Sequence, residues 1–104
     1  MDLENFKAKL RTYSEKDIIF TKHAQIRLIT RNIDLKEVVK NIINPEKLVF
    51  FEEQTTETNF KKYDCYFSYS KNLTHRYVFT INGKILIVTI IKINRDYQRM
   101  IKKK

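Results

Sequence analysis

Hydrophobic residues change their spacing once along the chain. Up to residue 43 they recur every three or four positions, and from residue 48 they alternate with polar residues. The first spacing is typical of helices and the second of strands. This order predicts an α+β protein, in which two or three N-terminal helices pack on one face of a sheet of roughly four antiparallel strands.

The first two helices have recognisable start and end signals. Asp2 is a suitable N-cap for the first helix, and Thr21 for the second, which follows a short apolar segment at residues 18–20. We expect the second helix to run to about Arg31. Asn32 comes next, and asparagine tolerates the left-handed conformation in which many helices end.

A third helix is marked at both ends. Asp34 and Glu37 match a capping box, in which each of the two residues bonds a backbone N–H group of the other. Asn44-Pro45 ends this helix, because proline disfavours the helical conformation in the residue before it. Between these signals lies an apolar stripe with helical spacing: Leu35, Val38, Val39, Ile42 and Ile43.

The rest of the chain has the composition of strands. We expect four of them, at residues 48–51, 63–70, 75–81 and 84–93. Asn82-Gly83 separates the last two and predicts a type I′ hairpin. The last strand is apolar on both faces and is expected to be central. We expect residues 95–104 to form a short basic helix or tail, and residues 1–104 to form a single domain.

Charge is distributed unevenly over the 104 residues, whose formal net charge is +9. From residue 71 to the end there are nine basic residues and one acid, Asp96. Such a concentration favours a polyanionic partner, and nucleic acid is the usual one. An anionic membrane surface or an acidic protein segment would satisfy the same charge.

Several classes of protein do not fit the composition. Cys65 is the only cysteine, so no disulfide within the chain is expected, and no Cys or His pairs have zinc spacing. We therefore expect neither a metal nor a cofactor. The N-terminus has no apolar signal segment, and the longest apolar run, residues 85–91, is too short to span a bilayer. We expect a cytoplasmic protein that does not act at a membrane.

His23, Arg27 and Arg31 recur at steps of four on the second helix. This spacing places them along one stripe, where like charges repel unless an anion neutralises them. His23 lies in the first turn, where free N–H groups favour a phosphate. Lys22 adds a further cation beside it. The alternative is that all four are solvated residues on the exposed side of an amphipathic helix.

The strands and the tail supply further candidates. His75 and Arg76 are adjacent in a strand, so their side chains point to opposite faces and at most one can share a site with the helix stripe. Thr89 interrupts an apolar strand, although a β-branched residue suits a strand in any case. Tyr97 can stack on a base, while its neighbours Lys92, Arg95 and Arg99 contact phosphates. A charged, exposed terminus is the alternative.

Cleavage of RNA without a metal would need three kinds of group. One takes the proton of the 2′-OH, one protonates the leaving 5′-oxygen, and cations stabilise the charged phosphate. His23, Arg27, Arg76 and Tyr97 are residues of these types. The sequence alone does not show that they converge.

The pattern His23-Ala24-x-x-Arg27-x-x-x-Arg31-Asn32-Ile33, followed by the capped helix that ends at Asn44-Pro45, resembles a family of small bacterial and archaeal domains. That family, formerly of unknown function, is related to the BrnT and RelE toxins, and the resemblance covers about residues 18–93. It implies a RelE-like fold and an endoribonuclease that serves as the toxin of a toxin–antitoxin pair, with an acidic antitoxin as partner.

The resemblance also implies site residues. By position in the motif, His23, Arg27 and Arg31 carry over, while Arg76 falls near the family's strand arginine and Thr89 near the threonine of its last strand. Asn32 stands where the family usually has glycine. The family's tyrosine after that threonine is missing, and Tyr97 is the residue that could replace it.

Three functions follow as hypotheses. The first is a metal-independent endoribonuclease of the RelE-like toxin type, acting on RNA such as ribosome-bound mRNA. The second is a non-catalytic nucleic-acid-binding protein on the same fold. The third is a protein-interaction module whose basic surface meets an acidic partner. The sequence predicts no particular oligomeric state.

Overall fold

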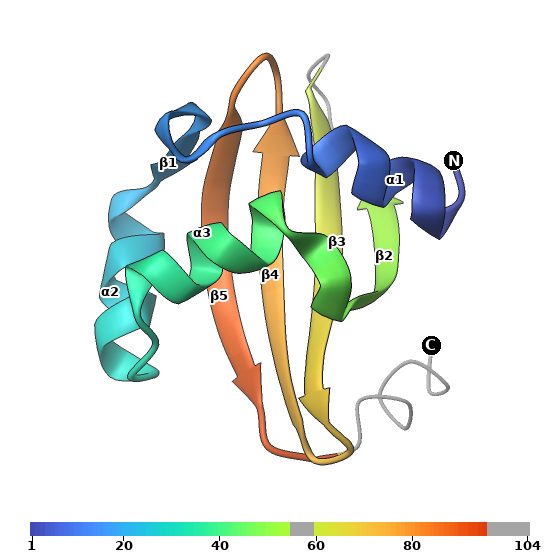
Figure 1. Cartoon of the computed structure of the whole chain (residues 1–104). Helices are drawn as coiled ribbons and strands as arrows, with labels where there is room; N and C mark the ends of the chain where they lie inside the picture. The colour runs from blue at the N-terminus through green and yellow to red at the C-terminus, as the bar shows by residue number, and fades with distance from the viewer. Residues whose placement is uncertain (55–59, 96–104) are drawn as a thin grey trace.

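The computed structural model describes residues 1–54 and 60–95 and has the α+β architecture expected from the sequence (Figure 1). Its helices and 3₁₀ turns are α1 (Leu3–Leu10), η1 (Glu15–Asp17), α2 (Lys22–Thr30), α3 (Leu35–Ile43) and η2 (Pro45–Lys47). Its strands are β1 (Ile18–Phe20), β2 (Leu48–Gln54), β3 (Lys61–Ser70), β4 (Leu73–Ile81) and β5 (Ile85–Ile93). No helix in the described ranges is long and apolar enough to cross a membrane.

The helix signals at the N-terminal side act as expected. The Asp2 side chain accepts a hydrogen bond from the backbone N–H of Asn5 at 2.8 Å and so caps α1. Thr21 Oγ1 accepts the backbone N–H of Ala24 at 3.1 Å and caps α2. Asn32 follows α2 in the left-handed conformation, with φ of 54°. Asp2 and Thr21 thus provide acceptors for backbone N–H groups that the start of a helix leaves without partners. Asn32 allows the chain to turn away at the end of α2.

The capping box predicted for α3 is half right. Asp34 is the N-cap, and its side chain accepts the backbone N–H of Lys36 at 3.0 Å. The Glu37 carboxylate does not complete the box, because it accepts a hydrogen bond from the hydroxyl of Tyr69. The helix ends at Ile43, directly before Asn44-Pro45, as predicted.

The sheet differs from the prediction of four antiparallel strands. It has five strands in the order β1-β5-β4-β3-β2, and β1 lies parallel to β5. The additional strand is the apolar segment at residues 18–20, which pairs in register with Ile85, Leu86 and Ile87. Three residues are too few to show a period of two, and their partners lie more than 60 positions away. The interior position of β5 agrees with its apolar composition.

The connection between β4 and β5 is a hairpin of a different type from the one predicted. Ile81 pairs with Ile85, so the connection contains Asn82, Gly83 and Lys84. The N–H of Asn82 donates to the carbonyl of Lys84 at 2.9 Å. Gly83 has φ of 73°, whereas Asn82 does not have the positive φ that a type I′ turn requires.

One face of the sheet carries the core. Tyr77, Phe79 and Ile81 point to this face from β4, and the apolar sides of α1 and α3 cover them. The other face of β4 carries Arg76 and Val78. Helix α2 has a different position: it continues from β1 along the side of β5, so it lies at the edge of the sheet (Figure 1).

Candidate functional site

The stripe predicted on α2 is present and largely exposed. Lys22, His23 and Arg31 are exposed, and Arg27 is half-buried. The guanidinium Nε of Arg27 donates to Nε2 of His23 at 3.4 Å. In this arrangement Nε2 of His23 is the acceptor nitrogen, so the ring carries its proton on Nδ1. This nitrogen becomes able to take a proton from a bound group when Arg27 turns its N–H groups to that group instead.

The start of α2 adds backbone donors to these side chains. The first N–H groups of a helix have no partner within the helix. Thr21 satisfies the N–H of Ala24, which leaves the N–H groups of Lys22 and His23 at the open end of the helix. A phosphate at this end would meet two backbone donors, an imidazole and a guanidinium.

The end of β5 lies beside the end of α2. The hydroxyl of Thr21 donates to the carbonyl of Val88 at 3.3 Å and its N–H donates to that of Ile87, which fixes the start of α2 against β5. Both elements then run in the same direction (Figure 1). The nine residues of α2 rise about 13.5 Å, the length of roughly four strand residues. These average lengths put the end of α2 about level with Lys92.

Neither α2 nor β5 contains an Asp or Glu. We call the basic side chains of these elements and of the residues shortly after them the basic surface: Lys22, His23, Arg27, Arg31, Lys92 and Arg95. Within the described part of the chain, none of them lies within ion-pair distance of a carboxylate. The basic surface is therefore an unneutralised patch, which an anion would stabilise.

Arg76 is not part of the basic surface. Its Nε donates to Oδ1 of Asp64 at 2.7 Å, and its Nη2 donates to Oδ2 of the same carboxylate. Asp64 is fully buried on β3, and the guanidinium lies 5.4 Å from the centre of the Tyr66 ring. The hydrogen bonds to Asp64 raise the pKa of Arg76 further. The predicted phosphate clamp is thus engaged by a carboxylate that joins β3 to β4.

The other predicted residues fall into separate groups. Thr89 pairs with Val78 and lies on the same face as Arg76, whereas Lys92 pairs with His75 on the helix-covered face. The strand β5 separates α2 from β4, and the Arg76 side chain reaches toward β3 on the far side. No hydrogen bond or ion pair between described residues joins Arg76 to the α2 stripe. Tyr97 and Arg99 lie outside the described residues.

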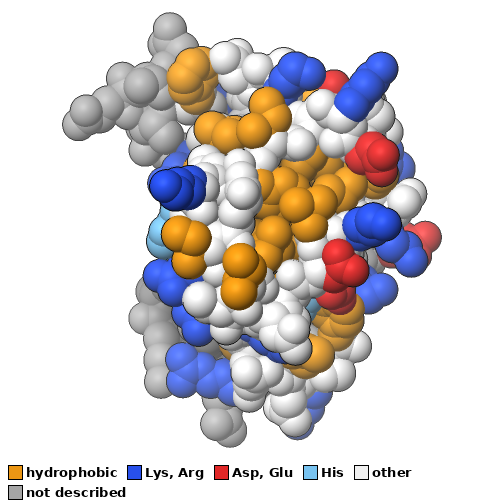
Figure 2. Space-filling model, turned by 90° about the vertical axis from the view of Figure 1, so that its left-hand side faces the viewer, with side chains coloured by type: hydrophobic (Ala, Val, Ile, Leu, Met, Phe, Trp, Pro, Cys, Tyr) orange, Lys and Arg blue, Asp and Glu red, His pale blue; other side chains and the backbone are white. Residues whose placement is uncertain are grey.

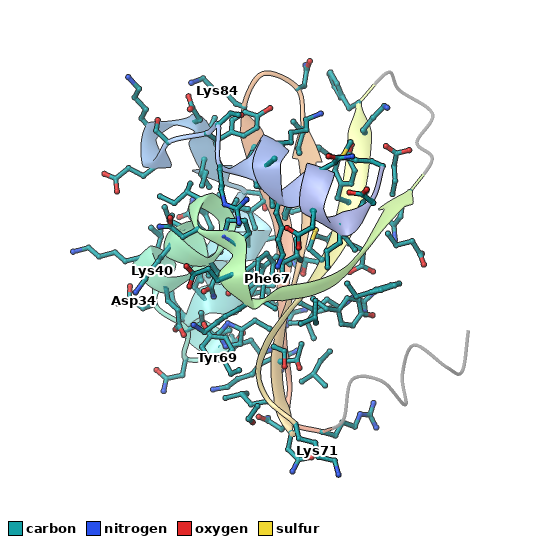
Figure 3. The ribbon with its side chains drawn as sticks, turned by 45° about the vertical axis from the view of Figure 1, so that its right-hand side comes forward. Asp34, Lys40, Phe67, Tyr69, Lys71 and Lys84 are labelled. Carbon is teal, nitrogen blue, oxygen red and sulfur yellow. The ribbon has the colours of Figure 1, made fainter. Side chains whose placement is uncertain are left out.

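A buried polar network that the sequence did not predict connects α3 to the sheet. Figure 3 labels one of its members, Tyr69. Asn41 Nδ2 donates to the hydroxyls of Tyr69 and Tyr77, at 2.7 and 3.0 Å. The Tyr77 hydroxyl lies 2.8 Å from Nδ1 of His75, and the Tyr69 hydroxyl donates to Glu37. Glu37 and Asn41 are two polar residues four positions apart among the apolar positions of one helix. This spacing is the sequence feature that could have indicated the network.

Burial controls the charges of this network. It lowers the pKa of His75, which is 3% exposed, and the nearby Lys92 lowers it further, whereas Glu37 acts in the opposite direction. Burial, and the hydrogen bond to Glu37, raise the pKa of Tyr69 to about 12. His75 is therefore neutral at pH 7 and enclosed, which makes it a structural group rather than a proton donor open to substrate.

Within residues 1–54 and 60–95, no cluster of His, Cys, Asp and Glu side chains has the arrangement of a metal site. No protein-family model matches the sequence, and searches of curated proteins and of solved structures find no significant match. The resemblance to the RelE-related family therefore depends on the motif residues alone.

Proposed function

We propose that this protein is a cytoplasmic, metal-independent endoribonuclease of the RelE-like toxin type, on a RelE-like fold, and that the basic surface binds its RNA substrate. The observation that carries this proposal is the contact between His23 and Arg27 at the open start of α2, on a surface without carboxylates. The motif that resembles the RelE-related family contains the same two residues.

The proposed reaction starts with a phosphate at the start of α2, bound by the Arg27 guanidinium and the backbone N–H groups of Lys22 and His23. When Arg27 turns its N–H groups to this phosphate, its hydrogen bond to Nε2 of His23 is released. Nε2 then accepts the proton of the neighbouring 2′-OH, whose oxygen attacks phosphorus. The bond from phosphorus to the 5′-oxygen breaks, and a 2′,3′-cyclic phosphate forms. Tyr97 is the proposed donor of the proton that the leaving 5′-oxygen takes up.

The same surface could bind RNA without cleaving it, and one observation favours this second candidate. The charge of Arg76, which the family resemblance places in the catalytic site, is already neutralised by Asp64. A site that depends on Arg76 would have to break a bidentate, partly buried ion pair first. The endoribonuclease proposed here uses Arg27 in its place.

Cleavage of RNA in the presence of EDTA distinguishes the two candidates. We expect purified protein to produce fragments with 2′,3′-cyclic phosphate ends from free or ribosome-bound mRNA. His23→Ala should lower the cleavage rate by about 100-fold or more, because it removes the proton acceptor. Arg27→Ala should weaken both binding and cleavage.

Arg11→Ala is the matched control for Arg27→Ala, because Arg11 is an exposed arginine at the end of another helix, α1. It should leave cleavage unchanged. Cleavage that survives His23→Ala would rule out the proposed site. Salt-sensitive RNA binding without cleavage of any RNA would favour the second candidate.

A further inference from the structure

An apolar groove lies between α3 and the first strand of the sheet. Its volume is about 500 Å³, and its apolar lining consists of Ile18, Phe20, Leu35, Val39 and Ile43. Figure 2 shows hydrophobic side chains gathered in a hollow at the centre of this side of the molecule. None of the lining residues belongs to the basic surface.

The groove exists because α3 is apolar on two sides. Val38 and Ile42 point into the core and are fully buried. Leu35, Val39 and Ile43 form a second row, at steps of four, which lines the groove. Leu35, the first residue of this row, is 44% exposed. Val39 is buried as part of the core, whereas Leu35 is exposed and Ile43 is half-buried, so the two ends of the second row are available to a partner.

The backbone of β1 favours a helix over a strand as the occupant. β1 is an edge strand of the sheet, and Ile18 and Phe20 of this strand line the groove. The N–H of Ile18 already donates to the carbonyl of Glu15, and the carbonyl of Phe20 accepts a hydrogen bond from Gln25. A three-residue edge with two backbone groups already hydrogen-bonded leaves few N–H and C=O groups for pairing with an added strand. A helix needs only the apolar groove.

Charges on the rim indicate the chemistry of the partner. Lys16, Lys36 and Lys40 line the groove together with one acid, Glu15. In the described part of the chain, no carboxylate lies within ion-pair distance of these lysines. Lys36 and Lys40 are four residues apart on α3 and repel each other, and carboxylates from a partner would remove that cost.

We propose that this groove binds an amphipathic, acidic helix of a partner protein. Apolar side chains at successive helical turns of the partner fill the space lined by Phe20, Leu35 and Val39. Glutamate and aspartate side chains beside them meet Lys16, Lys36 and Lys40. The interaction does not use the basic surface, so it stands independently of the proposed ribonuclease activity.

Display of two peptide libraries on phage tests this proposal. Both libraries contain amphipathic helices with the same apolar positions, and their remaining positions are rich in Asp and Glu in one library and in Lys and Arg in the other. We expect the full-length protein to enrich binders from the acidic library only. The double variant Lys36→Glu/Lys40→Glu should weaken the selected peptides about tenfold or more, and added salt should weaken them in the wild type.

Leu35→Asp should abolish binding, because it places a charge in the groove. It should not unfold the protein, since an acidic side chain in the first turn of α3 is favourable for the helix. Val49→Asp is the matched control: Val49 is 38% exposed on β2, at the opposite end of the sheet. Enrichment of neither library, enrichment from the basic library, or peptide binding that survives Leu35→Asp would overturn the proposal.

Discussion

At the scale of single residues, the Arg76–Asp64 pair shows how burial decides the role of a charge. Asp64 is completely buried, and both of its oxygens accept hydrogen bonds from Arg76. A carboxylate without solvent needs such a partner, because the cost of removing it from water is several kcal/mol. The arginine therefore stabilises the fold, and its loss would affect any measured activity through the folded fraction.

Arg76→Ala is expected to lower the free energy of unfolding by about 3 kcal/mol or more, because it leaves Asp64 buried and unpaired. Urea denaturation followed by far-UV circular dichroism measures this, since the chain has no tryptophan. The double variant Arg76→Met/Asp64→Leu removes both charges and should recover most of the loss. A stable Arg76→Ala protein that fails to cleave RNA would instead support a direct catalytic role.

The enclosed His75 predicts how stability depends on pH. Burial, with Lys92, lowers its pKa in the folded protein below the ordinary value of 6.5. As the pH falls below 6.5, the histidine of the unfolded chain therefore binds a proton, whereas His75 of the folded protein does not yet do so. Stability is complete above about pH 6.5 and decreases as the pH falls below it, by at most about 1.4 kcal/mol per pH unit for one proton.

Urea denaturation between pH 7.5 and 5.5 tests this dependence. His75→Asn should lower stability at pH 7.5 and remove much of its pH dependence. His23→Asn is the matched control, because it removes the other histidine, whose side chain is exposed. A slope that persists in His75→Asn and disappears in His23→Asn would show that the wrong ring has been assigned.

At the scale of helices and strands, signals that act within a few residues could be read from the sequence. The N-caps Asp2, Thr21 and Asp34 and the stop at Asn44-Pro45 act over at most four positions, and each acts as expected. Pairing between distant segments could not be read. The strand at residues 18–20 exists because β5 offers it a partner, and no local pattern contains that information.

For the candidate site too, local features could be predicted from the sequence and long-range contacts could not. The stripe of His23, Arg27 and Arg31 follows from helical spacing, and in the structure His23 and Arg31 are exposed and Arg27 is half-buried. The partner of Arg76 depends on the register of β3 against β4, which brings Asp64 to within reach. The network around His75 depends on how α3 lies across the sheet. Local spacing therefore predicts which side chains share a helix, but not what faces them.

At the scale of the whole molecule, the net charge of +9 is distributed unevenly. The basic surface on α2 and β5 has no acid of its own, whereas α1, α3 and β2 each contain Glu residues. A polyanion is therefore attracted to a particular side of the protein rather than to its charge in general. The salt dependence of RNA binding measures this, since each phosphate that a protein cation neutralises releases counterions.

We expect Arg31→Gln to make the plot of log affinity against log salt concentration for single-stranded RNA shallower by about 0.7, the contribution of one phosphate contact. Arg31 is exposed at the end of α2 and makes no ion pair with another described residue, so its removal should cost no folding stability. Arg11→Gln changes the net charge by the same amount on α1 and should leave the slope unchanged. Equal changes in both variants would mean that RNA responds to total charge alone, and that the basic surface is not its binding site.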